Sequence, residues 1–135
     1  MNSLRSKIFV ILALAFTASI AVYYATRRAP ACAGDGKKMS TQAECQAWGI
    51  DVAVCKDAIA KARETTARAA PKSETQLQCE TRFTDCFAIA GGGFAPVPSF
   101  CLRKTDKGDE VTEIRYLTYE ADRMNRRKTI EVRID

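Results

Sequence analysis

Hydrophobic positions divide the chain into three zones of different periodicity. Ile8 to Ala25 is an apolar run of 18 residues without a charge. Residues 40–88 carry apolar positions spaced by three and four, which indicates helices, and residues 97–135 contain β-branched and aromatic runs with an alternation of two, which indicates strands. We therefore expect an α+β protein in which an N-terminal apolar helix precedes a helical part and then a strand part.

Residues 1–28 have the pattern of a signal anchor or signal peptide. Arg5 and Lys7 precede the apolar run, as in segments that direct export. A helix of 18 residues is about 27 Å long, close to the thickness of a bilayer core of about 30 Å. Ser19-Ile20-Ala21 is an acceptable cleavage site, but the run continues through Tyr23-Tyr24, which favours an uncleaved anchor. Uncleaved, Ile8–Ala25 would hold the protein in the membrane.

Residues 29–39 are small and polar, and we expect them to form a flexible linker. Cys32 lies within it. A lipid-modified cysteine would directly follow the apolar run, whereas Arg27, Arg28 and Pro30 intervene here. We therefore expect Cys32 to be a disulfide partner or a loose thiol.

Three helices are predicted in the helical part, residues 40–88. Thr41-x-x-Glu44 is a capping box for a short helix that ends before Gly49. Asp51 can cap a second helix, which Pro71 ends. The expected buried seam of this second helix is Val52, Cys55, Ile59, Ala62, Thr66 and Ala69.

The third helix should begin at Ser73 or Thr75. Joined by the tight turn at Pro71, the second and third helices should lie antiparallel as a small helical hairpin. Ala-richness in the second helix favours close approach of a partner helix.

Six cysteines in so short a chain indicate disulfides that stabilise a modest core. They are Cys32, Cys45, Cys55, Cys79, Cys86 and Cys101. Many connectivities are possible, and the sequence does not choose among them. Cys79–Cys86 requires the third helix to end by Thr84, and Cys45–Cys55 requires the break at Gly49, because helical rise separates cysteines within one helix. Cys55 and Cys86 lie about equally far from the turn at Pro71, so they should be adjacent across the helical hairpin. We therefore favour Cys55–Cys86 with Cys45–Cys79, and Cys32–Cys101 is the remaining pair.

Redox, metal and enzymatic roles have little support in the composition. The chain has no C-x-x-C motif, no short-spaced cysteine pair for zinc and no histidine. The missing histidine excludes a histidine-assisted nucleophile and removes the commonest acid–base side chain near neutral pH. We expect no catalytic residues, no metal and no cofactor.

The strand part, residues 97–135, follows a glycine-rich joint at residues 91–98. Val111 to Tyr119 is predicted to be a strand, and Lys128 to Ile134 alternates apolar and polar residues. We expect a short antiparallel β-hairpin, or three strands including Phe100, packed on the helices because a lone hairpin is marginal. With the helical part it would form one cysteine-rich domain, residues 40–135.

A basic cluster marks the predicted hairpin loop, in a chain whose net charge is +5. It comprises Arg123, Arg126, Arg127 and Lys128. Such a cluster can contact anionic lipid head groups or another polyanion, or it can be a solvated turn. Nucleic acid is not expected, because aromatic residues are not interleaved with these cations.

Several spacings together resemble one known family. The segments are Ala43-Glu44-Cys45, Val54-Cys55-Lys56, Ala62-Arg63-Glu64-Thr65, Ala69-Ala70-Pro71-Lys72, Gln78-Cys79 and Phe83 with Cys86. Residues 43–86 thereby resemble the YgiB-like family of bacterial envelope proteins, a domain of unknown function. The resemblance implies an envelope location and transfers no catalytic residue.

These patterns predict a non-enzymatic protein of the bacterial cell envelope, whose biological role the sequence does not specify. It would be a structural or interaction module held on the periplasmic side of the cytoplasmic membrane, or secreted to the periplasm if cleaved, with another envelope protein as a possible partner. A periplasmic thiol-redox protein and a module that binds polyanions or lipid head groups are the alternatives. No small-molecule substrate is indicated.

Overall fold

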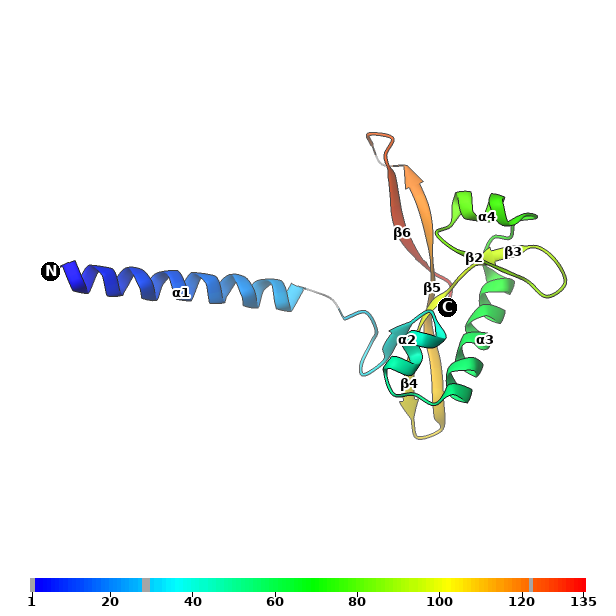
Figure 1. Cartoon of the computed structure of the whole chain (residues 1–135), viewed down its shortest axis with the longest axis horizontal. Helices are drawn as coiled ribbons and strands as arrows, with labels where there is room; N and C mark the ends of the chain where they lie inside the picture. Colours follow the sequence, from blue (N-terminus) through cyan, green and yellow to red (C-terminus); the bar gives the residue numbers. More distant parts are fainter. Residues whose placement is uncertain (1, 28–29, 122) are drawn as a thin grey trace. The chain divides into compact units, whose positions relative to one another are not determined.

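A computed structural model describes residues 2–27, 30–121 and 123–135, in two units, Met1–Ala31 and Cys32–Asp135. The first contains the helix α1 (Asn2–Arg27) (Figure 1). Its stretch Leu4–Thr26, 23 residues, is long and apolar enough to cross a membrane, a property that signal sequences share. At 1.5 Å per residue it is about 34 Å long, so the expected N-terminal apolar helix is confirmed.

The second unit combines three helices with two antiparallel sheets, which confirms the α+β class. A four-stranded sheet has the order β1-β4-β5-β6, and β2 and β3 form a separate small hairpin. The elements in chain order are β1 (Lys37–Met39), α2 (Gln42–Ala47), α3 (Val52–Ala69), α4 (Gln76–Arg82), β2 (Cys86–Ala88), β3 (Phe94–Pro96), β4 (Ser99–Thr105), β5 (Gly108–Ala121) and β6 (Arg127–Arg133).

The helix starts are those that the sequence predicts. Thr41 Oγ1 accepts a hydrogen bond from the Glu44 amide (3.2 Å), and the Glu44 carboxylate accepts one from the Thr41 amide (3.2 Å), which completes the capping box. Asp51 accepts from the Ala53 amide (3.0 Å) at the start of α3. Thr75 caps α4 through the Gln78 amide (3.2 Å). Each cap satisfies an amide that has no partner within its helix.

The buried face of α3 differs in part from the predicted seam. It consists of Cys55, Ala58, Ala62 and Thr66, whereas Val52 is 45% exposed and Ala69 is also exposed. This face packs on β3, β4 and β5, and its Cys55 end also packs on α2. The small side chains Ala58 and Ala62 allow the sheet to approach the helix closely.

Two hydrophobic clusters hold this unit together. The larger joins α2 and α3 to the sheet and comprises Met39, Cys45, Cys55, Ala58, Ala62, Phe100, Leu102 and Ile114. The smaller lies under α4 and comprises Ala70, Cys79, Phe83 and Tyr116. Phe83 and Tyr116 meet edge to face with ring centres 5.5 Å apart, a geometry that aromatic pairs favour.

The prediction of a flexible linker over residues 29–39 is wrong at Cys32 and at Lys37–Met39, and its first residue, Ala29, lies outside the described residues. Cys32 is 4% exposed, and Lys37–Met39 form the edge strand β1, in which Met39 pairs with Phe100. The polar composition concealed this strand, because one buried side chain, Met39, suffices to anchor a three-residue edge strand to the core.

The strand predictions are confirmed in outline. The alternation that runs through β6 and the residue after it places Ile130, Val132 and Ile134 half-buried between exposed neighbours. Residues 108–121 form a single long strand, β5, which pairs with β4 on one side and β6 on the other. The turn between β4 and β5 is tight, since Thr105 pairs with Gly108.

Candidate functional site

All six cysteines are paired in disulfides, and the pairing differs from the favoured one. The bonds are Cys32–Cys101, Cys45–Cys55 and Cys79–Cys86, with Cα–Cα separations of 5.8, 5.8 and 6.2 Å. The predicted Cys32–Cys101 bond is present. Cys55–Cys86 and Cys45–Cys79 are wrong, and two short local loops are closed instead.

Local breaks in helix geometry explain the two short loops. α2 ends at Ala47, and Gly49 takes a left-handed conformation (φ +75°) that turns the chain back toward Cys45. α4 ends at Arg82, and Phe83 is extended, so Cys86 returns to Cys79 at the start of β2. The favoured pairing assumed that α4 would lie along α3, but α4 packs against β2 and β3.

Glu113 is an acidic side chain close to the Cys32–Cys101 disulfide. It lies where the register between β4 and β5 shifts by a bulge, and its backbone is left-handed (φ +51°). A residue with a side chain seldom adopts this conformation. The bulge directs the carboxylate to the turn that follows Cys32, where it accepts a hydrogen bond from the Ala33 amide (2.8 Å).

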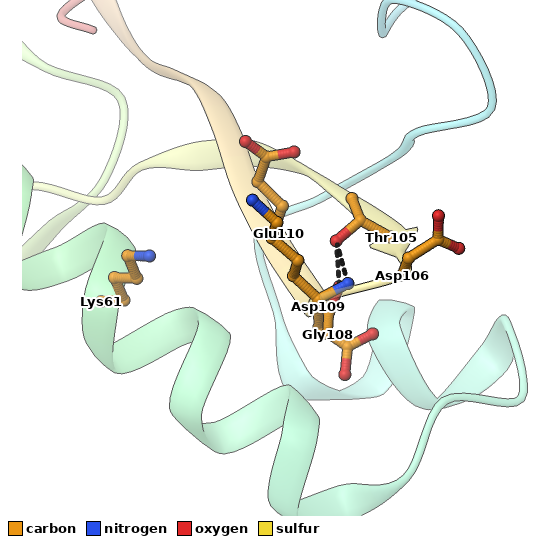
Figure 2. Close-up of a pocket in the computed structure, with 7 residues that line it drawn as sticks. Lys61, Thr105, Asp106, Gly108, Asp109 and Glu110 are labelled. Atoms are coloured by element: carbon orange, nitrogen blue, oxygen red, sulfur yellow. Dashed lines mark hydrogen bonds between the residues drawn. The ribbon is translucent and has the colours of Figure 1, made fainter.

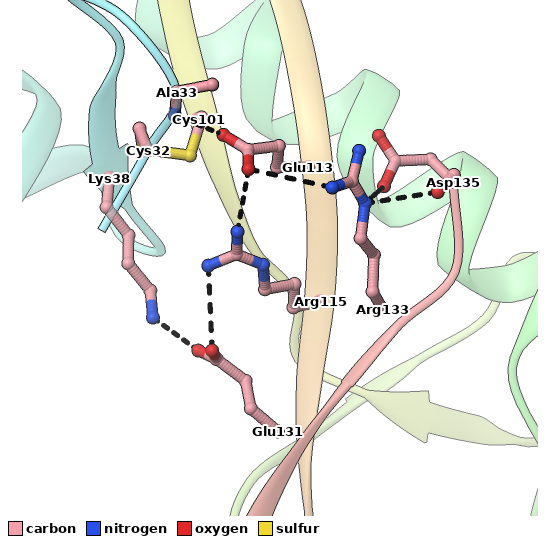
Figure 3. Close-up of polar contacts among 9 residues, drawn as sticks. All are labelled: Cys32, Ala33, Lys38, Cys101, Glu113, Arg115, Glu131, Arg133 and Asp135. Carbon is pink, nitrogen blue, oxygen red and sulfur yellow. Dashed lines mark hydrogen bonds and ion pairs between the residues drawn. A yellow bond between two sulfur atoms is a disulfide. The ribbon is translucent and has the colours of Figure 1, made fainter. Parts of the chain in front are cut away.

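Around Glu113 an ion-pair network joins β1, β5, β6 and the end of the chain (Figure 3). Arg115 contacts Glu113 at 2.8 Å and Glu131 at 3.5 Å, and Lys38 pairs with Glu131. Arg133 contacts Glu113 at 3.6 Å and Asp135 at 3.0 Å. The three cations and three carboxylates balance, so this network serves to hold strands and turn together.

The same place brings Cys32, Cys101 and Glu113 close, with potential ligand atoms within 4.8 Å of one another. Both sulfur atoms are already bonded to each other. A cysteine binds a metal as a free thiolate, which neither sulfur atom can provide while the bond is intact. In the oxidised protein, this cluster is therefore a disulfide beside a carboxylate.

Open depressions border the β4–β5 turn. One of about 450 Å³ is lined by Lys61 and residues 105–110 (Figure 2), where Thr105 Oγ1 donates to the Gly108 carbonyl (2.8 Å). A second, of about 270 Å³, lies beside Trp48, whose exposed ring is 4.7 Å from Lys37 Nζ. Both mix acidic and basic side chains, so their charge selects no class of ligand.

The predicted basic cluster lies at the turn between β5 and β6, and the structure gives its members different roles. Arg127 turns back to the fold: its guanidinium donates to the Thr81 carbonyl (2.7 Å) and lies 4.1 Å from the Tyr119 ring centre. All four side chains are exposed. Arg127 also has a structural role through these two contacts, and the contact of Arg123, Arg126 and Lys128 with anions stays a prediction.

Sequence reasoning missed two residues in these regions. Glu113 lies inside a predicted strand, and no residue of that strand indicates a bulge with a left-handed backbone. Met124 is 70% exposed at the β5–β6 turn, amid the basic cluster. The sequence does show an apolar residue isolated among charged ones at this position, and that pattern could have identified Met124.

The fold and the disulfide pairing together define the class of protein. It is a disulfide-bonded α+β unit that follows one apolar helix of bilayer length. The chain belongs to a family described as protein of unknown function (DUF1190), which matches residues 35–108, just over half of the chain. The resemblance found in the sequence is confirmed to this extent, and the narrower YgiB-like name stays a prediction. The match ends where β5 begins.

No curated protein matches the chain. No solved structure matches it either.

Proposed function

We propose that this protein is a non-enzymatic interaction module tethered to the outer face of a bacterial cytoplasmic membrane, where it contacts another envelope component. The observation that carries the proposal is the direct succession of a bilayer-length helix and a compact unit with three disulfides. Disulfides persist in oxidising compartments and are rare in the cytosol. The compact unit is therefore assigned to the exported side and α1 to the bilayer.

The disulfides support a structural role over thiol exchange. Five of the six cysteines are at most 4% exposed, and Cys86 is half-buried. Attack on a disulfide needs access to a sulfur atom. The rival thiol-redox function requires at least one bond that mild reductants open readily near neutral pH, and the burial of Cys32, Cys45, Cys55 and Cys101 opposes this for two of the three bonds.

A side-specific labelling experiment tests the location. Intact spheroplasts that contain the full chain are treated with a membrane-impermeant amine reagent, and labelled lysines are identified by mass spectrometry. The proposal predicts labelling at Lys56, Lys72 and Lys107 but not at Lys7, which precedes the apolar run and serves as the internal control. Labelling of Lys7 alone would reverse the topology, and loss of the N-terminal peptide would show cleavage of the anchor.

A further inference from the structure

We propose that residues 123–128, the tip of the β5–β6 hairpin, are a contact site for anionic phospholipid head groups. The inference rests on the proposed function, which places the compact unit at a membrane surface. To that proposed function the inference adds which surface of the protein makes the contact and which class of ligand it binds.

The hairpin projects beyond the sheet as a two-stranded arm (Figure 1). β4 accompanies β5 only as far as the pair Ser99–Arg115, whereas β5 and β6 continue together from Arg115–Arg133 to Ala121–Arg127. The tip is thus carried away from the two hydrophobic clusters, so its side chains are available to a surface that the rest of the sheet does not reach.

The chemistry of the tip suits a lipid interface. Residues 119–128 carry four cations against two acids, and residues 123–128 contain no acid. Met124, 70% exposed, stands among the exposed cations Arg123, Arg126 and Lys128. Cations near an anionic bilayer contribute about 1 kcal/mol each, and an apolar side chain between them can enter the boundary between head groups and acyl chains.

The arm is held in place before any contact is made. Arg127 bonds to the Thr81 carbonyl, and Thr118 Oγ1 donates to the Arg82 carbonyl (3.0 Å). Phe83 and Thr118 also form an isolated β-bridge. The C-terminal end of α4 therefore braces β5 and β6, which lowers the conformational entropy that the tip would lose on binding.

Chain length keeps the compact unit close to a bilayer that holds α1. Four residues, 28–31, separate α1 from Cys32. Four residues span at most about 14 Å when fully extended. An anionic surface within such reach is present at a high effective concentration, which favours phospholipid over a freely diffusing polyanion.

The test uses the full chain in nanodiscs with one reporter tryptophan. The chain has a single tryptophan, so Trp48→Phe with Met124→Trp leaves only the tip reporter. Brominated lipid quenches it on contact, in discs of phosphatidylglycerol or of phosphatidylcholine. We expect quenching in the anionic discs, its loss in the zwitterionic discs, and its loss near 1 M salt, where the screening length is about 3 Å.

Two charge variants, a test variant and its matched control, are made in the chain that contains the reporter tryptophan. Arg123→Gln, Arg126→Gln and Lys128→Gln together remove the exposed tip cations and should weaken the contact about 100-fold. Lys56→Gln, Lys61→Gln and Arg68→Gln remove equal charge from α3 and should leave quenching unchanged.

Three outcomes would overturn the proposal: no quenching in anionic discs, equal quenching in both lipids, or equal loss in both charge variants. Binding of a soluble polyanion at the tip without any lipid quenching would likewise overturn it and assign the cations to another partner. The disc measurement does not depend on topology in cells, so it can fail while the lysine labelling pattern still supports the proposed function.

Discussion

At the scale of single residues, the carboxylate of Glu113 fixes the first turn of the disulfide-bonded unit. Its side chain is 13% exposed and contacts the Ala33 amide, Arg115 and Arg133 at once. Gly36 completes the same turn, since a Cβ placed on it would lie 3.1 Å from the Cβ of Cys32. The turn is therefore fixed by one carboxylate and one glycine beside the Cys32–Cys101 bond.

Replacing Glu113 by glutamine should destabilise the protein by about 2 kcal/mol, because two arginines lose a shielded partner. Glu110→Gln is the matched control: its partner Arg103 is 42% exposed and screened by solvent, so this loss should be clearly smaller. Chemical denaturation of both variants measures the difference. Equal losses would show that the network around Glu113 contributes no more than a surface ion pair.

Glu44 makes the start of α2 sensitive to acid. The backbone hydrogen bond from Ser40 is the main cause that lowers the pKa of this carboxyl from its ordinary value of 4.5, and the Ser40 side chain and the Thr41 amide act in the same direction. A lowered folded-state pKa contributes stability above the unfolded-state value, and this contribution is lost as the pH falls through the folded-state value.

The stability difference between the natural chain and Glu44→Gln should therefore be constant at neutral pH and shrink as the pH falls below about 4.5. Denaturation at a series of pH values measures it. A difference that is the same at pH 3 and pH 7 would show that the carboxylate charge has no part in the cap.

At the scale of elements, disulfides close loops of very different length. Cys45–Cys55 and Cys79–Cys86 span 10 and 7 residues and fasten the short helices α2 and α4. Cys32–Cys101 spans 69 residues and joins the start of the unit to β4. Helices of six or seven residues are unstable alone, so the two short bonds hold α2 and α4 where the core needs them.

Removal of the long-range bond should cost more than removal of a short one. In the chain-entropy account, replacing Cys32 and Cys101 by alanine costs about 4 kcal/mol, and replacing Cys45 and Cys55 about 3 kcal/mol. Denaturation of the two double variants, both purified in the same detergent, measures the order. The reverse order would mean that strain or residual structure outweighs loop entropy.

The arm gives a second prediction at this scale. Arg127→Gln removes the contacts with Thr81 and Tyr119, so amide exchange in residues 117–121 and 127–131 should accelerate about tenfold, as expected for about 1.4 kcal/mol. Arg123→Gln is the control, because the cation it removes is exposed at the turn. Hydrogen exchange read by mass spectrometry tests this prediction. Similar acceleration in both variants would show that the contacts of Arg127 do not stabilise the β5–β6 arm.

Local signals in the sequence predicted elements well and tertiary pairings less well. The caps at Thr41, Asp51 and Thr75 and the alternation in β6 depend on neighbouring residues, so pattern alone finds them. The strand β1 and the bulge at Glu113 depend on partners far along the chain. The predicted pairs Cys55–Cys86 and Cys45–Cys79 failed for the same reason: the path of α4 after Pro71 is set by β2 and β3, which the helical pattern does not contain.

At the scale of the whole molecule, one compact unit contains every disulfide and both hydrophobic clusters, and one apolar helix precedes it. A unit of this size has a modest core, and cross-links supply what burial does not. This dependence on disulfides supports the proposed export, because such bonds persist in oxidising compartments and are rare in the cytosol.

Trypsin mapping without reduction, on protein extracted from membranes after alkylation of free thiols, tests this account most directly. No lysine or arginine lies between Cys45 and Cys55, whereas Arg82 separates Cys79 from Cys86. The account predicts the peptide Met39–Lys56 released alone, lighter by two hydrogens than its reduced form, and the peptides of Cys32, Cys79 and Cys86 joined together. Alkylated cysteines, or Met39–Lys56 joined to another peptide, would contradict it.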